Sequence, residues 1–136
     1  MVILLDAEIV LTLHERVVAE TEETSGGLRD IALLESSVGR MSAGFGEYEL
    51  YPTLFEKAAA LLESIIRNHP FVDGNKRTAL ASAATMLRLN GWITTFGPEE
   101  AVAFALDVEA RRAGVEDIVT WLRQHSKTES WISGTV

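Results

Sequence analysis

The sequence contains no cysteine among its 136 residues. This absence excludes disulfide bonds, thiolate catalysis and thiolate zinc sites, and it fits a reducing compartment. No apolar run approaches the roughly 20 residues that cross a bilayer, and the N-terminal segment reaches Asp6 too early for a signal peptide. We therefore expect a cytoplasmic protein that has no membrane partner.

Basic residues are also scarce, since 12 Lys and Arg stand against 20 Asp and Glu, and the net charge is −8. Non-specific nucleic-acid binding needs a surplus of positive charge that displaces counterions from phosphates. We therefore expect no direct nucleic-acid binding, and any phosphate chemistry must use a local basic site. The length and a hydrophobic content of 47% predict one compact domain.

The spacing of apolar residues predicts an all-α protein of about six helices. The predicted helices cover residues 7 to about 23, 30 to about 41, 53 to 69, 75 to 90, 97 to about 113 and 115 to about 125. Asp6, Asp30 and Thr53 are the expected N-caps, and a turn at residues 25–27 ends the first helix. Pro70 ends the third helix and Gly91 the fourth, so the stretch between these two apolar helices should be rigidly held.

Three segments have no helical period. Residues 44–52 are predicted to form a loop or short hairpin, whose aromatic residues Phe45, Tyr48 and Tyr51 either hold a peptide substrate or seal the edge of the core. Residues 92–96 are interpreted as a linker that packs against the domain. The helical domain should comprise residues 1–126, with a flexible tail at 127–136.

The most concentrated chemistry lies between the third and fourth helices. The stretch reads His69, Pro70, Phe71, Val72, Asp73, Gly74, Asn75, Lys76 and Arg77. A helix that opens beside cations can hold phosphate through its free N–H groups. His69 can take a proton from a hydroxyl at neutral pH, Asp73 is a hard ligand for Mg²⁺, and the cations can neutralise a transferred phosphoryl group.

Each of these residues also has an ordinary structural role. His69 could complement a helix C-terminus, Asp73 or Asn75 could cap the next helix, Gly74 could supply a turn, and the two cations could be solvated. Taken singly, these roles are favoured, and it is their occurrence together that indicates a site. His14 has no second histidine at helical spacing, and we predict a surface or packing residue rather than a metal ligand.

The stretch resembles the signature of the Fic/Doc superfamily, H-P-F-x-(D/E)-G-N-(G/K)-R. Further similarity to the death-on-curing (Doc) branch covers about residues 1–125, including residues 27–36, the entry to the third helix at residues 51–53, and residues 78–91. The resemblance implies a single-domain helical bundle with a short flap, which transfers part of ATP to a protein hydroxyl. It thus implies ATP as substrate and Mg²⁺ as cofactor.

The resemblance also implies roles for individual residues. His69 would be the general base, Asp73 would hold Mg²⁺, and Arg77 would bind phosphate. The anion hole would be formed by Gly74, Asn75 and Lys76. The flap that aligns the target would fall at residues 44–51 and would bring Phe45, Tyr48 and Tyr51 to the target segment.

Two positions bear on which part of the nucleotide is transferred. Members that transfer AMP usually have glycine after the motif asparagine and a second arginine three residues after the first, and here Lys76 and Leu80 stand at those positions. This favours a Doc-like kinase that transfers the γ-phosphoryl group to a Ser or Thr hydroxyl, with elongation factor Tu as the implied target. AMP transfer and a catalytically silent partner-binding module remain the alternatives.

Many Fic proteins carry an inhibitory (S/T)-x-x-x-E-(G/N) helix. The only similar spacing here runs from Thr95 to Glu99, but it spans Gly97 and Pro98 and is followed by Glu100, so it does not match. Inhibition would then come from another chain. The resemblance implies a Phd-like antitoxin whose disordered tail folds on binding.

Overall fold

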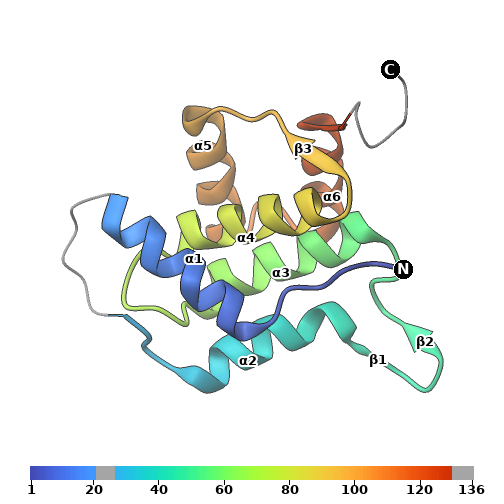
Figure 1. The fold of residues 1–136 in the computed structure, drawn as a ribbon, viewed down its shortest axis with the longest axis horizontal. Coiled ribbons are helices and arrows are strands. Elements are labelled where there is room, and N and C mark those ends of the chain that lie inside the picture. The colour runs from blue at the N-terminus through green and yellow to red at the C-terminus, as the bar shows by residue number, and fades with distance from the viewer. Residues whose placement is uncertain (21–26, 130–136) are drawn as a thin grey trace.

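The structure is a computed structural model that describes residues 1–20 and 27–129 (Figure 1). Within these residues the chain forms six α-helices, one 3-10 helix and two small antiparallel strand pairs, which confirms the predicted helical class. The elements are α1 (Ala7–Glu20), α2 (Ile31–Gly39), η1 (Arg40–Ser42), β1 (Gly44–Phe45), β2 (Tyr48–Glu49), α3 (Leu54–Asn68), α4 (Asn75–Leu89), β3 (Trp92–Thr94), α5 (Pro98–Glu109), α6 (Val115–Gln124) and β4 (Ser126–Thr128). None of the described helices is long and apolar enough to cross a membrane.

Helix α3 is the central element of the fold. The hydroxyl of Thr53 accepts a hydrogen bond from the backbone N–H of Glu56 at 3.2 Å, which confirms the predicted N-cap. Every residue from Lys57 to Ile66 is buried, so α3 has no solvent-facing stripe over this length. It packs against α2, α4, α5 and α6, and its central position fixes the turn that follows it.

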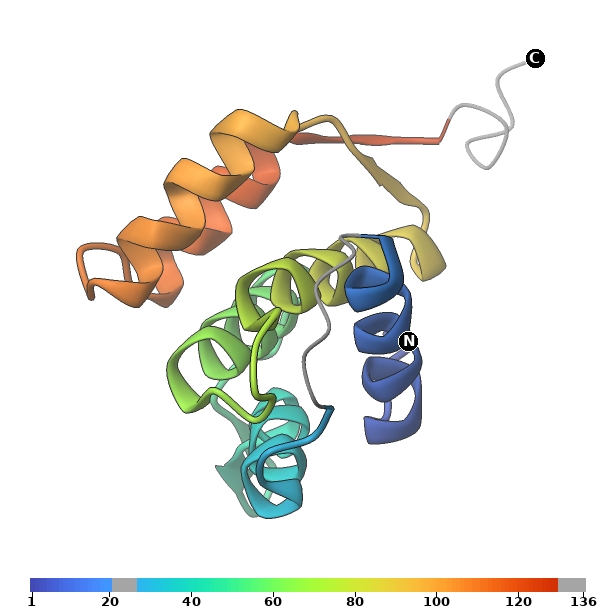
Figure 2. The same ribbon diagram turned by 90° about the vertical axis from the view of Figure 1, so that its left-hand side faces the viewer.

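The other helices surround α3 and α4 in two groups (Figures 1 and 2). Helix α1 packs against α4, and α2 packs against α3. Helices α5 and α6 run alongside each other, and Phe104 of α5 stacks on Trp121 of α6 with ring centroids 4.4 Å apart. The predicted N-caps hold: Asp6 accepts from Ile9 N–H at 2.9 Å, and Asp30 accepts from Leu33 N–H at 3.2 Å.

The segment at residues 44–52 contains the hairpin β1–β2, one of the two forms predicted. A side chain at Gly44 would place its Cβ 2.1 Å from the carbonyl oxygen of Tyr48, so this position requires glycine. The buried ammonium of Lys57 donates to the carbonyl oxygen of Met41 and to the Glu49 carboxylate, both at 3.0 Å. The base of the hairpin is thus fastened to the first turns of α3.

The C-terminal part differs from the prediction in two places. Trp92–Thr94 is not a plain linker but strand β3, which pairs in antiparallel register with Ser126–Thr128, so residues 127 and 128 belong to a strand and not to a flexible tail. Helix α5 ends at Glu109 and not near Ala113, because Arg111 adopts a left-handed conformation with φ 62°. Parts of the first predicted helix, the turn at 25–27 and the tail fall on residues 21–26 and 130–136, outside the described residues.

A buried ionic network fastens α3 to its neighbours. Glu63 of α3 is 4% exposed and contacts the guanidinium groups of Arg40 at 2.6 Å and Arg67 at 3.0 Å. Burial lowers the pKa of Arg40, but its hydrogen bonds to Glu63 and Tyr51 outweigh this effect and leave the pKa raised above its ordinary value. Arg67 also donates to the carbonyl oxygen of Ala113 at 2.8 Å, which ties the α5–α6 connection to α3.

We predict that Glu63→Gln lowers the free energy of unfolding by about 2 kcal/mol, because two guanidinium groups lose their shared counter-charge. This loss of stability is smaller than the loss expected on breaking a fully buried ion pair, since the guanidinium groups of Arg40 and Arg67 are partly exposed. Urea unfolding measures the change. Glu35→Gln on the exposed face of α2 is the control and should stay within about 0.5 kcal/mol, and an equal loss in both variants would contradict a special role for Glu63.

Candidate functional site

The candidate site is built on the turn that joins α3 to α4. His69 ends α3 in the left-handed conformation, with φ 50° and its N–H donating to the carbonyl oxygen of Ile65 at 3.2 Å. Pro70 follows, which excludes another helical turn. The side chain of His69 is 45% exposed, whereas Phe71 is 1% exposed and anchors the turn in the core. The His69 imidazole is therefore accessible, while the turn that carries it is anchored in the core.

Residues 27–30 run beside the turn and hold its backbone. Arg29 N–H donates to the carbonyl oxygen of Pro70 at 2.7 Å, and Val72 N–H donates to that of Gly27 at 3.0 Å. The Arg29 guanidinium donates to the carbonyl oxygens of His69 at 2.7 Å and Asn68 at 2.9 Å. These carbonyls at the end of α3 would otherwise lack partners, so Arg29 acts as a cationic C-cap for the helix that carries His69.

The side-chain amide of Asn75 lies against the imidazole of His69. Asn75 is 5% exposed; its Oδ1 accepts from Phe71 N–H at 3.0 Å, and its Nδ2 donates to the Phe71 carbonyl oxygen at 3.0 Å. These two bonds fix the orientation of the amide, so the group that faces His69 Nδ1 at 3.3 Å is a donor. The contact holds the imidazole against the amide and leaves Nε2 on the side of the ring that faces α5.

His14 of α1 supports the other side of the turn. It is 3% exposed and stacks on Phe71 with ring centroids 3.8 Å apart and an interplanar angle of 5°. Its Nε2 lies 3.0 Å from the carbonyl oxygen of Asp73, and because a carbonyl only accepts, this nitrogen carries a proton. His14 is therefore a packing residue, one of the two roles predicted from the sequence. It also holds the backbone of Asp73 in place through this hydrogen bond.

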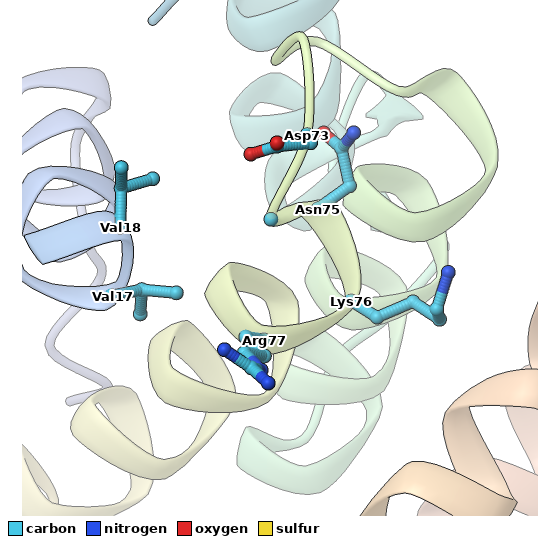
Figure 3. Close-up of a pocket in the computed structure, with 7 residues that line it drawn as sticks. Val17, Val18, Asp73, Asn75, Lys76 and Arg77 are labelled. Carbon is cyan, nitrogen blue, oxygen red and sulfur yellow. The ribbon is translucent and has the colours of Figure 1, made fainter. Parts of the chain in front are cut away.

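The N-terminus of α4 is open to an anion. Gly74 occupies the N-cap position with φ 76°, and no side chain caps the helix, so the predicted capping roles of Asp73 and Asn75 are not observed. A pocket of about 250 Å³ lies against this helix end, and its lining residues are Val17, Val18, Asp73, Gly74, Asn75, Lys76 and Arg77 (Figure 3). Uncapped N–H groups and the positive end of the helix dipole favour phosphate at such a position.

Asp73 and Arg77 carry the charges of this pocket. Asp73 Oδ1 is buried and has no hydrogen-bond partner among the described residues. An unpartnered carboxylate oxygen beside an anion pocket fits Mg²⁺, which is commonly held by one or two carboxylates together with substrate phosphates. No group of three or more metal-ligating side chains occurs in the described residues, so Mg²⁺ would depend on those phosphates and on water. Arg77 is exposed and forms no ion pair within the same residues.

Lys76 occupies a different part of the site from Arg77. Its side chain extends away from Asp73 and Arg77, towards α5 (Figure 3). There its Nζ lies 3.1 Å from Oε2 of Glu109, and the same oxygen lies 3.4 Å from His69 Nε2. The turn therefore has an anion pocket on its α1 side and a group formed by His69, Lys76 and Glu109 on its α5 side.

The expected flap residues are not in contact with this turn. Phe45 and Tyr48 stack on each other with centroids 5.1 Å apart and are 78% and 57% exposed. Their hairpin precedes α3 and the turn follows it, so they lie at opposite ends of a helix about 22 Å long (Figure 1). Tyr51 does not share their exposure, because it is 9% exposed and its hydroxyl accepts from Arg40 at 2.7 Å.

Three supporting residues were missed or underestimated from sequence. Arg29 was noted only within a longer similarity, and His14 was given no part in the site. Glu109 was not singled out at all, because nothing in a helical pattern shows which distant side chain an acid will meet. A histidine facing the buried side of α1 was the one available signal, since neighbouring Val10 and Leu13 mark that face as apolar.

The uncapped end of α4, with a carboxylate and a cation beside it, is suited to bind phosphate, and the accessible His69 stands on the other side of the same turn. A profile of the Fic/DOC family matches residues 4–87, which is more than half of the chain. The chain belongs to the Fic/DOC family.

Two curated relatives agree with this assignment. The chain is 53% identical to "Toxin Doc" of Mycolicibacterium smegmatis over 64 residues, which are 47% of this chain and 49% of the relative. It is 35% identical to "Protein kinase doc" of Escherichia phage P1 over 98 residues, which are 72% of this chain and 76% of the relative. The first match thus spans about half the length of that relative.

We predict that His14→Leu lowers the free energy of unfolding by about 1 kcal/mol, because the Asp73 carbonyl loses its donor while the apolar contact with Phe71 is largely kept. His14→Gln, which can still donate, should recover part of the loss. Urea unfolding of the three proteins tests this. Equal stability of His14→Leu and the wild type would show that the hydrogen bond contributes nothing.

Proposed function

We propose that this chain is a Doc-like toxin that transfers the γ-phosphoryl group of ATP to a Ser or Thr hydroxyl of a target protein. The observation that carries the proposal is the open end of α4, where Gly74 leaves the helix uncapped and Asp73 and Arg77 line the same pocket. The name of the phage P1 relative, protein kinase doc, supports phosphoryl transfer rather than another phosphate chemistry.

Each residue of the turn has a distinct task in this reaction. The N–H groups of the first turn of α4 and the Arg77 guanidinium bind phosphate oxygens. Asp73 would hold Mg²⁺, which would neutralise phosphate charge. His69 takes the proton of the target hydroxyl while the hydroxyl oxygen forms a bond to the γ-phosphorus of ATP. The bond between that phosphorus and the β–γ bridging oxygen breaks, and ADP leaves. Asn75 keeps the turn and the imidazole in register during these steps.

The alternative reaction, AMP transfer, is less well supported by the charges on α4. A second arginine at position 80 would lie one helical turn beyond Arg77 and add a second cation to that face. Leu80 is instead 8% exposed and apolar. Lys76 supplies the additional cation on the other side of the turn, beside His69. The available cations therefore favour a pose in which the terminal phosphoryl group lies near His69.

The partners and the setting follow from the proposed reaction. The target would be a translation factor such as elongation factor Tu, and a Phd-like antitoxin would silence the toxin in the cytoplasm. The word toxin in the name of the Mycolicibacterium relative supports a toxin–antitoxin pair. The hairpin with exposed Phe45 and Tyr48 would contact the target at a distance from the turn, and Tyr51 would support it through Arg40.

The test is the intact mass of elongation factor Tu and of other candidate targets after incubation with the chain, ATP and Mg²⁺. We expect the wild type to add one phosphate, and His69→Ala to lower the rate at least about 100-fold, because proton transfer to a base contributes factors of this order. His125→Ala is the matched control, since this second partly buried histidine contacts Trp121 and Glu100, away from the turn.

The outcomes separate three functions. Addition of AMP instead of phosphate would support the alternative transferase. No addition, together with growth arrest that persists in His69→Ala, would support a catalytically silent module that acts by binding. Phosphate addition that is unaffected by His69→Ala would contradict the proposed role of His69.

A further inference from the structure

Glu109 of α5 contacts both His69 and Lys76 of the turn. A single oxygen, Oε2, lies 3.1 Å from the ammonium of Lys76 and 3.4 Å from Nε2 of His69. Its side chain is 32% exposed, so solvent weakens the attraction between Glu109 and Lys76. Glu109 lies beyond residues 4–87, the part of the chain that matches the family profile.

The position of Glu109 is unfavourable for its own helix. It is the last residue of α5, where the carbonyl ends give the helix dipole its negative pole, and the last turn contains no basic residue. A carboxylate at this place costs helix stability, and a neutral or basic side chain would serve the helix better. The stability of α5 therefore gives no reason for an acid at position 109.

The backbone around Glu109 is firmly held. Arg67 of α3 donates to the carbonyl oxygen of Val108 at 3.3 Å and to that of Ala113 at 2.8 Å. Arg67 is itself paired with buried Glu63 of the same helix. The end of α5 is thus fixed to α3, the helix that carries His69. The backbone of Glu109 is therefore held at a position from which its carboxylate reaches the imidazole.

We propose that Glu109 is a positioning residue that holds the Lys76 ammonium beside His69 for phosphoryl transfer. Lysine is flexible, and without a partner its ammonium would move freely in solvent. Held by Glu109, it stands where the charge of the transferred group develops, next to the base that receives the hydroxyl proton. Protein kinases of an unrelated fold use a lysine–glutamate pair to the same end. This inference rests on the proposed function.

The same carboxylate also suits the positive charge that His69 gains when it accepts a proton. Oε2 of Glu109 lies 3.4 Å from Nε2 of His69, the ring nitrogen that does not face Asn75. A carboxylate on this side of the ring orients the imidazole and stabilises the imidazolium that forms when the base accepts a proton. Glu109 therefore acts through Lys76 and His69 and does not itself touch the nucleotide.

Steady-state kinetics of Glu109→Gln test the proposal. We expect kcat for transfer from ATP to fall about tenfold, because the Lys76 ammonium loses its fixed place. KM for ATP should stay the same or decrease, because a negative charge near the triphosphate is removed. Asp107→Asn is the matched control: it removes the same charge from the same helix and breaks an exposed ion pair with Arg112, and its kinetics should match the wild type. Thermal unfolding of both variants shows whether the fold is retained.

An unchanged kcat in Glu109→Gln would overturn the proposal, and so would a higher kcat, which would show that Glu109 restrains the enzyme. An equal fall of kcat in Asp107→Asn would also overturn it, since the effect would then come from net charge. Glu109→Asp, which keeps the charge, should be closer to the wild type than Glu109→Gln, and the reverse order would contradict positioning by an ion pair.

A second measurement does not depend on catalysis. Limited acetylation of lysines followed by mass spectrometry should label Lys76 more slowly in the wild type than in Glu109→Gln, with exposed Lys127 as the internal standard. Equal labelling would show that the ion pair does not exist in solution and would overturn the proposal. If the wild type transfers AMP instead of phosphate, the proposed function fails, but the same kinetic comparison applied to AMP transfer still decides the role of Glu109.

Discussion

The side-chain amide of Asn75 is the interaction on which the site depends. It bonds both the N–H and the carbonyl group of Phe71, and it faces His69 with its remaining N–H. Phe71 can be buried only because its backbone polar groups find these partners inside the protein, since an unpaired buried N–H or carbonyl costs about as much as the hydrogen bond it lacks. One residue therefore closes the turn, contacts the proposed base His69 and begins the helix whose end we propose binds phosphate.

The turn is held from three sides by segments that are distant in sequence. Helix α1 contributes His14, residues 27–30 contribute Arg29 and its neighbours, and α5 contributes Glu109. The α1 side of the turn presents Asp73 and Arg77, and the α5 side presents Lys76. In the proposed reaction, this division would let a polyphosphate bind at the end of α4 while its reacting end reaches His69. The arrangement follows from the reversal of direction between α3 and α4, which exposes the two faces of a single short turn.

The sequence predicted the helices well, because their ends depend on local signals. Thr53 with Glu56, Pro70 and Gly91 define where α3 and α4 begin or end through their own backbone preferences. The pairing of β3 with β4 was missed because it joins segments more than 30 residues apart, and neither is long enough to be recognised alone. The end of α5 was placed too late because alanine and arginine favour helix, whereas Arg111 adopts a left-handed conformation that ends it. The partners of Lys76 and Tyr51 are tertiary, and no local pattern reveals them.

The central claim is that the open end of α4 binds the phosphates of ATP with Mg²⁺. A titration with a non-hydrolysable ATP analogue and Mg²⁺, followed by backbone amide NMR, tests it most directly. The account predicts that the largest shift changes occur at Asn75, Lys76 and Arg77, and that Arg77→Ala weakens binding at least about tenfold, which corresponds to a lost charge-assisted pair. Shift changes centred on another surface, or binding that is unaffected by Arg77→Ala, would contradict it.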